Sequence, residues 1–242
     1  MNRPARKVTP AAQWRRRYAR KGRTWTILAA NLPNKSWLRR TAQVAWVRAK
    51  MVRVDAMTIA ECTPELAGRI GRLRGVRVTS AHPNAGGNGN VIVTKAKPIR
   101  GEYRTIYTAL NGHHVTLNMA RAIITKGRTE LTVDAVHFPS RGGYPKSSST
   151  REQRARVVRQ VAEHKAVTAD RVFAGDINDE WRWVLGILRD VDKRWQHLGG
   201  DGVEHVFGIV SGRTLGQRML RYGRASDHKR TSRVSVGILN RK

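Results

Sequence analysis

Gly175-Asp176-Ile177-Asn178 and, about fifty residues later, Ser226-Asp227-His228 are the stretches of this chain that decide its fold. Each lies directly against an apolar run typical of a β-strand, residues 171–174 before the first and 234–239 after the second. Carboxylates, an amide and an imidazole at strand ends are groups suited to a phosphate and a divalent cation. The two stretches therefore predict one site at the edge of a sheet.

Three further polar residues follow apolar runs upstream. Asn31 follows residues 27–30, Glu61 follows residues 57–60, and His137 ends the run 131–136. Five strand-like segments are thus each bordered by a residue that can bind metal or move a proton. Chance produces one such coincidence easily but five in order rarely, so we expect these residues to meet in space.

The order Asn, Glu, His, Gly-Asp-x-Asn, Ser-Asp-His resembles the endonuclease/exonuclease/phosphatase superfamily, whose best-known member is DNase I, over roughly residues 24–240. The resemblance implies a four-layer α/β/β/α sandwich of two mixed, largely antiparallel sheets with helices outside. It also implies hydrolysis of phosphodiesters or phosphomonoesters with Mg²⁺ or a similar cation. Two hairpin signals, Asn111-Gly112 and Lys126-Gly127-Arg128, independently favour antiparallel pairing.

The charge of the chain is extreme. Lys and Arg total 47 against 17 Asp and Glu, a net charge of +30. The first fifty residues contain no acid at all, and the stretch from Ser211 onward contains only Asp227. Such a surface attracts polyanions, of which nucleic acid is the first candidate. The alternative is a lineage that simply favours arginine.

We divide the 242 residues into a basic N-terminal arm, residues 1–23, and a single catalytic domain, residues 24–242. The arm serves either solubility or phosphate contact. A helix expected over residues 36–53 has a cationic face, and a basic loop follows His137. Together with the C-terminal cations, these predict nucleic-acid contacts, most clearly with DNA, at Arg39, Arg40, Arg141, Lys146 and Arg224.

The cysteine content and the hydropathy of the sequence limit where in the cell we expect the protein. The single cysteine, Cys62, excludes an internal disulfide, and we expect it to be buried. No apolar run approaches the length of a membrane span, and the basic N-terminus lacks the apolar core of a secretory signal. We therefore expect a monomeric protein in the cytoplasm, or one carried with nucleic acid.

The metal site is predicted at Glu61, with Asn31 and Asp227 beside it. Oxygen ligands suit a hard cation, Mg²⁺ or else Mn²⁺ or Ca²⁺, and Mg²⁺ keeps several waters, so few protein ligands suffice. The sequence has no close Cys/His cluster of the kind that zinc prefers. The alternative for Glu61 is an exposed carboxylate at a strand end.

Asp176 and Asn178 alternate along a turn, so both side chains can face one side. In the resembling family the matching Asp orients or deprotonates the attacking water, and the matching Asn binds a phosphate oxygen or positions that Asp. The alternative is an Asx-turn that only ends the strand.

His228 would stand beside the phosphate and needs a carboxylate on its second ring nitrogen to hold its tautomer. In the family that partner is an Asp at the start of a strand, whereas this chain has Glu204 at the corresponding place. Glu is one methylene longer, so Asp201 stays an alternative partner.

His137 is the second imidazole and a candidate acid toward the leaving oxygen. DNase I-like nucleases and bacterial sphingomyelinases resemble this chain in having His here, whereas apurinic-site endonucleases usually have Asn. Those repair enzymes also tend to carry an acid where this chain has Pro33. Both departures count against a dedicated abasic-site enzyme.

Three functions follow from these patterns. The first is a metal-dependent nuclease acting on DNA, and on RNA as a second substrate, with little sequence preference. The second keeps the fold but makes the chain a phosphatase or phospholipase, which explains the site but not the charge. The third is a basic nucleic-acid-binding protein with weak or no turnover, for which the Glu204 substitution leaves room.

Overall fold

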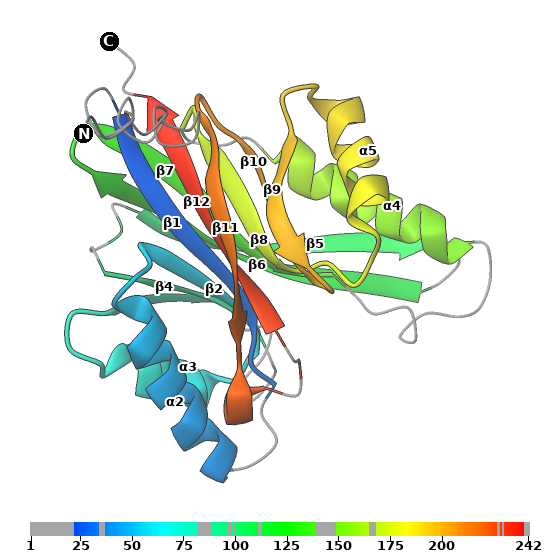
Figure 1. Cartoon of the computed structure of the whole chain (residues 1–242). Helices are drawn as coiled ribbons and strands as arrows, with labels where there is room; N and C mark the ends of the chain where they lie inside the picture. The colour runs from blue at the N-terminus through cyan, green and yellow to red at the C-terminus, as the bar shows by residue number, and fades with distance from the viewer. Residues whose placement is uncertain are drawn as a thin grey trace, which may run out of the picture.

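The computed structural model describes most of the chain, namely residues 22–33, 37–81, 89–95, 98, 100–110, 113–138, 149–164, 168–226, 228 and 230–239. Two six-stranded mixed sheets pack face to face, and helices cover the outer face of each (Figure 1). The predicted four-layer sandwich is therefore confirmed. Within the described residues, no helix combines the length and apolarity needed to cross a bilayer.

The first sheet has the strand order β11-β12-β1-β2-β4-β3. In this order the strands span Arg213–Arg221, Arg230–Leu239, Gly22–Asn31, Ala56–Cys62, Gly89–Thr94 and Arg77–Ala81. Helices α2 (Trp37–Met51) and α3 (Pro64–Gly71) and the short 3₁₀ helix η2 (Gly223–Ala225) accompany it. The start of α3 is set locally, because the Thr63 hydroxyl accepts a hydrogen bond from the Leu66 amide at 3.2 Å and Pro64 occupies the first turn.

The second sheet has the order β5-β6-β7-β8-β10-β9. In this order the strands span Arg100–Leu110, His113–Lys126, Thr129–His137, Arg171–Asp176, Glu204–Ile209 and Gln196–Asp201. Helices α4 (Ser149–Glu163) and α5 (Trp181–Val191) accompany it. The residues between the two hairpin signals form one long strand, β6, and neither β9 nor β11 was predicted from the sequence.

Three apolar layers hold the sandwich together. Inward-facing residues of both sheets, such as Ile27, Val133 and Val234, form the layer between the sheets. A second layer joins α2 and α3 to the first sheet, and a third joins α4 and α5 to the second. The central strands β2, β4, β7 and β8 are buried nearly throughout, because both of their faces are covered.

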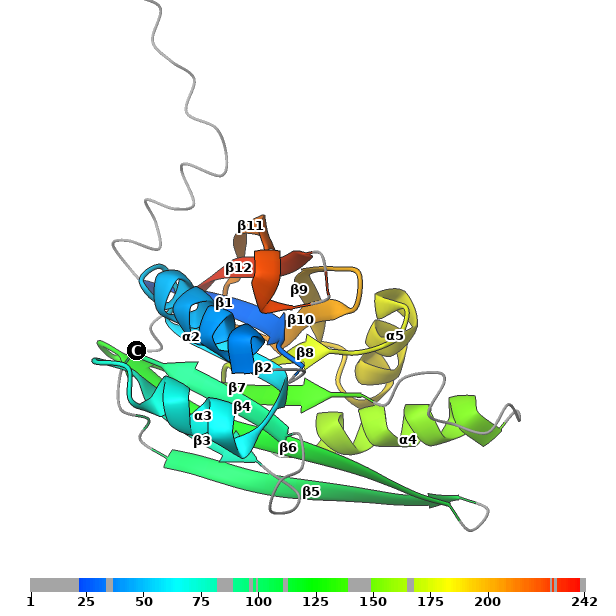
Figure 2. The ribbon, with the colours of Figure 1, turned by 90° about the horizontal axis from the view of Figure 1, so that it is seen from below.

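Strand direction decides where the polar strand ends meet. β1 and β2 are parallel, as are β7 and β8, while β12 and β10 are antiparallel to β1 and β8. The carboxyl ends of the four parallel strands therefore share one edge of the sandwich with the starts of β10 and β12. Figure 2 shows β1, β7 and β8 running in the same direction.

A charged cluster lies beneath the end of α4, inside the apolar third layer. The Asp134 carboxylate accepts hydrogen bonds from Arg121 Nε at 2.6 Å and from Arg171 Nε at 2.7 Å, and all three side chains are buried. Arg171 also donates to the carbonyls of Val161 and His164, both at 2.7 Å, at the end of α4. Burial by itself raises the pKa of Asp134, but the guanidinium groups of Arg171 and Arg121 outweigh it and lower that pKa.

We predict that Asp134→Asn destabilises the fold by about 3–5 kcal/mol, because it leaves two buried guanidinium groups without their counter-charge. Equilibrium urea unfolding measures this loss. Because the pKa of Asp134 is lowered in the folded state, its contribution is present above the unfolded value of 3.8 and is lost as pH falls below it.

The matched control is Asp192→Asn, which removes an exposed ion pair with Arg194. Exposed pairs contribute less than about 1 kcal/mol, so this variant should unfold close to the wild type. Equal losses in the two variants would contradict a special role for the buried cluster.

Candidate active site

The place of Asp176 is set by the glycine before it. Gly175 lies beside Val136 in the parallel β7–β8 pair, and a Cβ at Gly175 would come within 1.8 Å of the Val136 carbonyl oxygen. Only glycine allows this approach, which brings the next residues of the two strands, His137 and Asp176, side by side. Any larger residue at position 175 would push these two groups apart.

Glu61 reaches the site through a β-bulge. The register between β2 and β4 shifts between Ile59 and Cys62, so one residue of β2 is inserted without a partner. Glu61 has a φ of 56°, and Asn178 has a φ of 47°. Among the described residues, these are the two positions other than glycine with positive φ, and both belong to the site. Left-handed backbone at such residues is concentrated at functional positions.

The Asn31 amide joins the two sheets. Its Nδ2 donates to Glu61 Oε1 at 3.0 Å and to Asp176 Oδ2 at 2.8 Å. Asn31 ends β1 of the first sheet, whereas Asp176 ends β8 of the second. The predicted residues therefore converge across the inter-sheet space.

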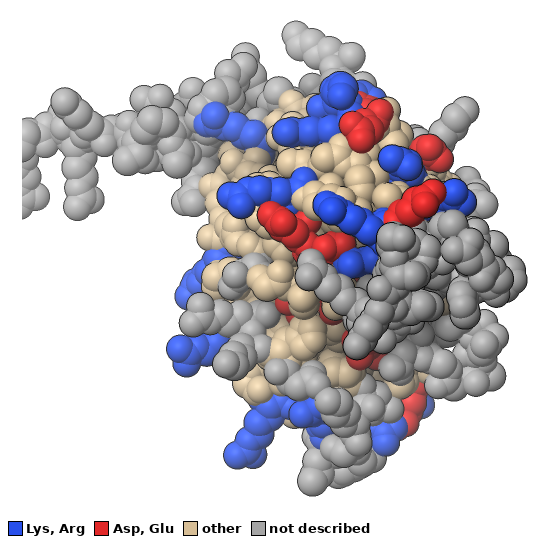
Figure 3. Space-filling model, turned by 90° about the vertical axis from the view of Figure 1, so that its right-hand side faces the viewer, with Lys and Arg blue, Asp and Glu red and all other residues tan. Residues whose placement is uncertain are grey.

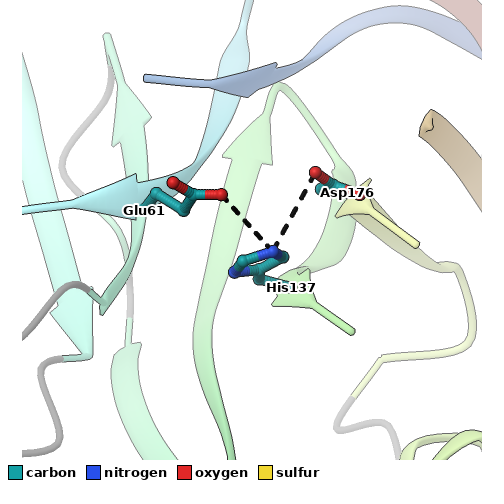
Figure 4. A group of neighbouring side chains, drawn as sticks. All are labelled: Glu61, His137 and Asp176. Atoms are coloured by element: carbon teal, nitrogen blue, oxygen red, sulfur yellow. Dashed lines mark ion pairs between the residues drawn. The ribbon is translucent and has the colours of Figure 1, made fainter. Parts of the chain in front are cut away.

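His137 completes this group. Its Nε2 lies 3.6 Å from Glu61 Oε1 and 3.9 Å from Asp176 Oδ2, as Figure 4 shows. One ligand atom of each of the three side chains lies within 4.8 Å of the others, a spacing that can hold a single metal ion. Asn178 lies beside them, with its Nδ2 3.2 Å from His137 Nε2 and donating to the Phe138 carbonyl at 2.8 Å.

The Asp176-Ile177-Asn178 turn is both an Asx-turn and part of the site. The backbone N–H of Asn178 donates to Asp176 Oδ1 at 3.0 Å, the hydrogen bond that defines an Asx-turn. The other carboxylate oxygen faces Asn31 and His137. Burial raises the pKa of Asp176, and the charge of His137 and the Asn31 hydrogen bond only partly oppose it. The carboxylate is therefore a better proton acceptor than an exposed aspartate.

A divalent cation fits this donor set. Glu61 and Asp176 supply carboxylate oxygens, and Asn31 Oδ1 is buried without a hydrogen-bond partner in the part of the chain that the structure describes. Rotation of this amide would bring the unpaired oxygen to the two carboxylates, where Nδ2 now lies, and an oxygen there suits a hard, oxygen-seeking ion. Asp227, the third predicted ligand, lies outside the described residues.

A second group of side chains begins directly opposite Asp176. Glu204, the first residue of β10, pairs with Asp176 across the antiparallel strands. Its Oε1 lies 2.6 Å from His228 Nδ1, so Glu204 is the carboxylate that holds this imidazole. Burial raises the pKa of Glu204, while the hydrogen bond from His228 opposes the shift. The extra methylene of Glu is thus accommodated.

Tyr222 is a member of the site that sequence reasoning missed. Its hydroxyl donates to Glu204 Oε1 at 3.1 Å and accepts from the Asn31 backbone amide at 2.7 Å. The ring is buried, and burial holds the pKa of the phenol well above its usual value, so the group stays a donor. Tyr222 therefore links the Glu204–His228 pair to the end of β1. Tyr222 lies six residues before His228, outside the motif that contains His228, so no sequence motif points to it.

The predicted nucleic-acid contacts divide into three groups. Arg39 and Arg40 lie in the first turns of α2, where Arg40 forms an ion pair with Glu65 of α3. Arg224 is exposed in η2, two residues before Ser226. Arg141 and Lys146 lie outside the described residues, as do residues 1–21 of the proposed arm.

We predict that Glu61→Gln weakens Mn²⁺ binding by at least about tenfold, because it removes one negative charge from the donor set. Mn²⁺ serves as a paramagnetic probe, and titration by electron paramagnetic resonance gives its dissociation constant without any substrate. Glu130→Gln, an exposed change at the far end of β7, is the control and should bind Mn²⁺ as the wild type does. Unchanged affinity in Glu61→Gln would rule Glu61 out as a ligand.

Comparisons with known proteins agree with this architecture. No family model and no curated protein matches the sequence. An endonuclease/exonuclease/phosphatase from Bacteroides vulgatus aligns with a TM-score of 0.69 and 9% identity, covering 90% of this chain and 99% of that one. One from Beutenbergia cavernae aligns with a TM-score of 0.67 and 14% identity, covering 89% and 72%.

A third structure, D. rerio TDP2 complexed with a single-strand DNA product, aligns with a TM-score of 0.59 and 12% identity, covering 88% of this chain and 98% of that one. Identities this low establish the fold alone. The order of motifs, the two-sheet topology and these alignments agree: the chain has the fold of the endonuclease/exonuclease/phosphatase proteins.

Proposed function

We propose that this protein is a divalent-metal-dependent nuclease that hydrolyses phosphodiester bonds of DNA, and of RNA as a second substrate, with little sequence preference. One observation carries the proposal. Two carboxylates, two amides and an imidazole meet around a single point, and a Glu–His pair begins directly opposite. Hydrolysis of a phosphodiester requires a base for water, a stabiliser of phosphoryl charge and a proton for the leaving oxygen.

Asp176 is assigned to the attacking water. Its raised pKa makes the carboxylate a better base than a solvated one, and the Asn31 and Asn178 hydrogen bonds fix its direction. Asn178 Nδ2 is assigned to a phosphoryl oxygen. The hydrogen bond from Nδ2 to the Phe138 carbonyl and the position of the Asn178 backbone hold this side chain in place. Arg154 supports this turn from α4 by donating to the Asn178 carbonyl at 2.7 Å.

The two imidazoles are assigned to the charge on the phosphate and to the leaving oxygen. Glu204 holds His228 through Nδ1, and Nε2 is assigned to the phosphate as a donor. His137, within reach of Asn178, is assigned the proton for the leaving group. A Mg²⁺ ion, or Mn²⁺ or Ca²⁺ in its place, held by Glu61, Asn31 and Asp227, would stabilise the negative charge of the phosphoryl oxygens.

The choice of DNA as substrate rests on charge. A net charge of +30 exceeds what one small phosphoester needs and suits a polyanion that contacts the surface at many points. Arg39, Arg40, Arg141, Lys146 and Arg224 are proposed backbone contacts, which give affinity without sequence information. We propose that the protein acts as a monomer, because the described side chains of one chain already include candidates for the base, the proton donor and the metal ligands.

We predict that the purified protein nicks supercoiled plasmid with Mg²⁺ and that EDTA abolishes nicking. Asp176→Asn should abolish it as well, because the amide cannot accept the proton of the water. His228→Ala should lower turnover by about two to four orders of magnitude yet retain DNA in gel-shift assays. Agarose electrophoresis of the plasmid forms measures all three.

Asp190→Asn, an exposed change on α5, is the control and should nick at the wild-type rate. Tight DNA binding without cleavage would favour a binding protein instead of a nuclease. Hydrolysis restricted to a small phosphomonoester or a phospholipid would favour a phosphatase or phospholipase. Equal loss of turnover and DNA retention in His228→Ala would make His228 a structural residue.

We also predict that Tyr222→Phe lowers kcat by about tenfold with little change in KM. The lost hydroxyl leaves Glu204 with one donor fewer, so His228 is held less firmly. In Tyr222→Phe/Glu204→Gln the loss should be no greater than in Glu204→Gln alone, because both changes act through one contact. Fully additive losses in steady-state assays would refute this linkage.

A further inference from the structure

The acid-free parts of the sequence become neighbours in the fold. α2, β11, η2 and β12 contain no Asp or Glu, although they carry arginines and lysines throughout. β1 and β12 are paired, and α2 packs against η2, so the two ends of the chain form one side of the molecule. Figure 2 shows α2, β11 and β12 gathered on the same side.

One stripe of α2 is turned toward β11. Trp46 and Lys50 lie one turn apart on one face of α2, and Arg53 lies in the turn that follows the helix, where its backbone N–H donates to the Lys50 carbonyl at 3.0 Å. Trp46 Nε1 donates to the Arg221 carbonyl at 3.1 Å, and Lys50 Nζ lies 5.8 Å from the Trp46 ring centroid. The tryptophan therefore fixes the cationic stripe beside the end of β11.

β11 and β12 place like charges directly opposite one another. Arg218 pairs with Arg233 across the antiparallel strands. Burial, and then the like charges of Arg218 and Arg53, lower the pKa of the Arg233 guanidinium, so the three groups are close enough to repel. Directly opposed like charges destabilise a sheet. Among the described residues, these three arginines have no ion-pair partner.

The opposite side of the molecule differs. α4 and α5 carry Glu152, Glu163 and Asp190 among their arginines, and Figure 3 shows acidic and basic side chains intermixed there. The acid-free composition of α2, β11, η2 and β12 therefore contrasts with the mixed charges of α4 and α5.

We propose that Lys50, Arg53, Arg218, Arg233 and Arg224, together the α2–β11 face, bind the sugar-phosphate backbone of the nucleic acid beyond the scissile phosphate. This inference rests on the proposed nuclease function and names the path of its substrate. A polyanion removes the Arg–Arg repulsion that folding alone leaves in place, and backbone contacts require only positive charge.

The α2–β11 face leads directly into the site. The Trp46 ring lies 5.0 Å from that of Tyr222, whose hydroxyl binds Glu204, the partner of His228. Arg218 lies three residues up β11 from Arg221, about 10 Å away, or about three base pairs of duplex. A strand cleaved beside His228 would thus extend for several nucleotides over this face.

The test is Arg218→Gln/Arg233→Gln, assayed on a long DNA duplex and on the small diester bis(p-nitrophenyl) phosphate. For the duplex we expect KM to rise about tenfold or more while kcat stays within about twofold. The slope of log affinity against log salt should fall by about 1 for each arginine. Turnover of the small diester should be unchanged, because it is too short to reach the face.

The control is Arg74→Gln/Arg128→Gln, which removes two exposed arginines in the turns that precede β3 and β7, remote from the site. Equal KM and salt slope in the two double variants would overturn the proposal, as would an equal fall in turnover of the duplex and of the small diester. If the wild type hydrolyses neither substrate, the proposed function fails, but fluorescence anisotropy with labelled duplex still decides whether the face binds DNA.

Discussion

The structure depends on holding two buried carboxylates opposite each other. Asp176 and Glu204 face each other across β8 and β10, both lose most of their hydration, and each raises the other's energy when charged. The neighbouring groups compensate. Asn31, Asn178 and His137 surround Asp176, while His228 and Tyr222 surround Glu204. A divalent cation would offset the repulsion between the two carboxylates most strongly. This explains why so many side chains able to bind a metal converge on a desolvated edge of the sheets.

The residues that sequence could predict are those marked by local pattern. Asn31, Glu61, His137 and Asp176 each follow an apolar strand, and strand direction alone brings such ends together. Tyr222 could not be predicted, because it acts through contacts with strands far away in the chain. Strands β9 and β11 were missed for another reason: glycines and charges interrupt their alternation, and neighbouring strands support them instead.

The buried Arg121–Asp134–Arg171 cluster could not be predicted from the sequence pattern either. Asp134 sits inside an apolar strand, where a charge ordinarily argues against burial. The strand tolerates the buried carboxylate because two guanidinium groups, one from β6 and one from β8, bind it. Only the order of strands in the sheet places β6 and β8 beside β7. The network in turn holds the end of α4, the helix whose Arg154 supports the Asn178 turn. Stability and site geometry are therefore connected through the same helix.

Neither sheet can form the site alone. Asn31 and Glu61 come from the first sheet, whereas His137, Asp176 and Glu204 come from the second. Two strained or crowded backbone positions, Glu61 with its positive φ and Gly175 against Val136, set the side chains within each sheet. The distance between the two halves is set by the apolar layer that separates the sheets. Because close-packed interiors transmit small displacements, the packing of residues far from the site decides whether its side chains meet.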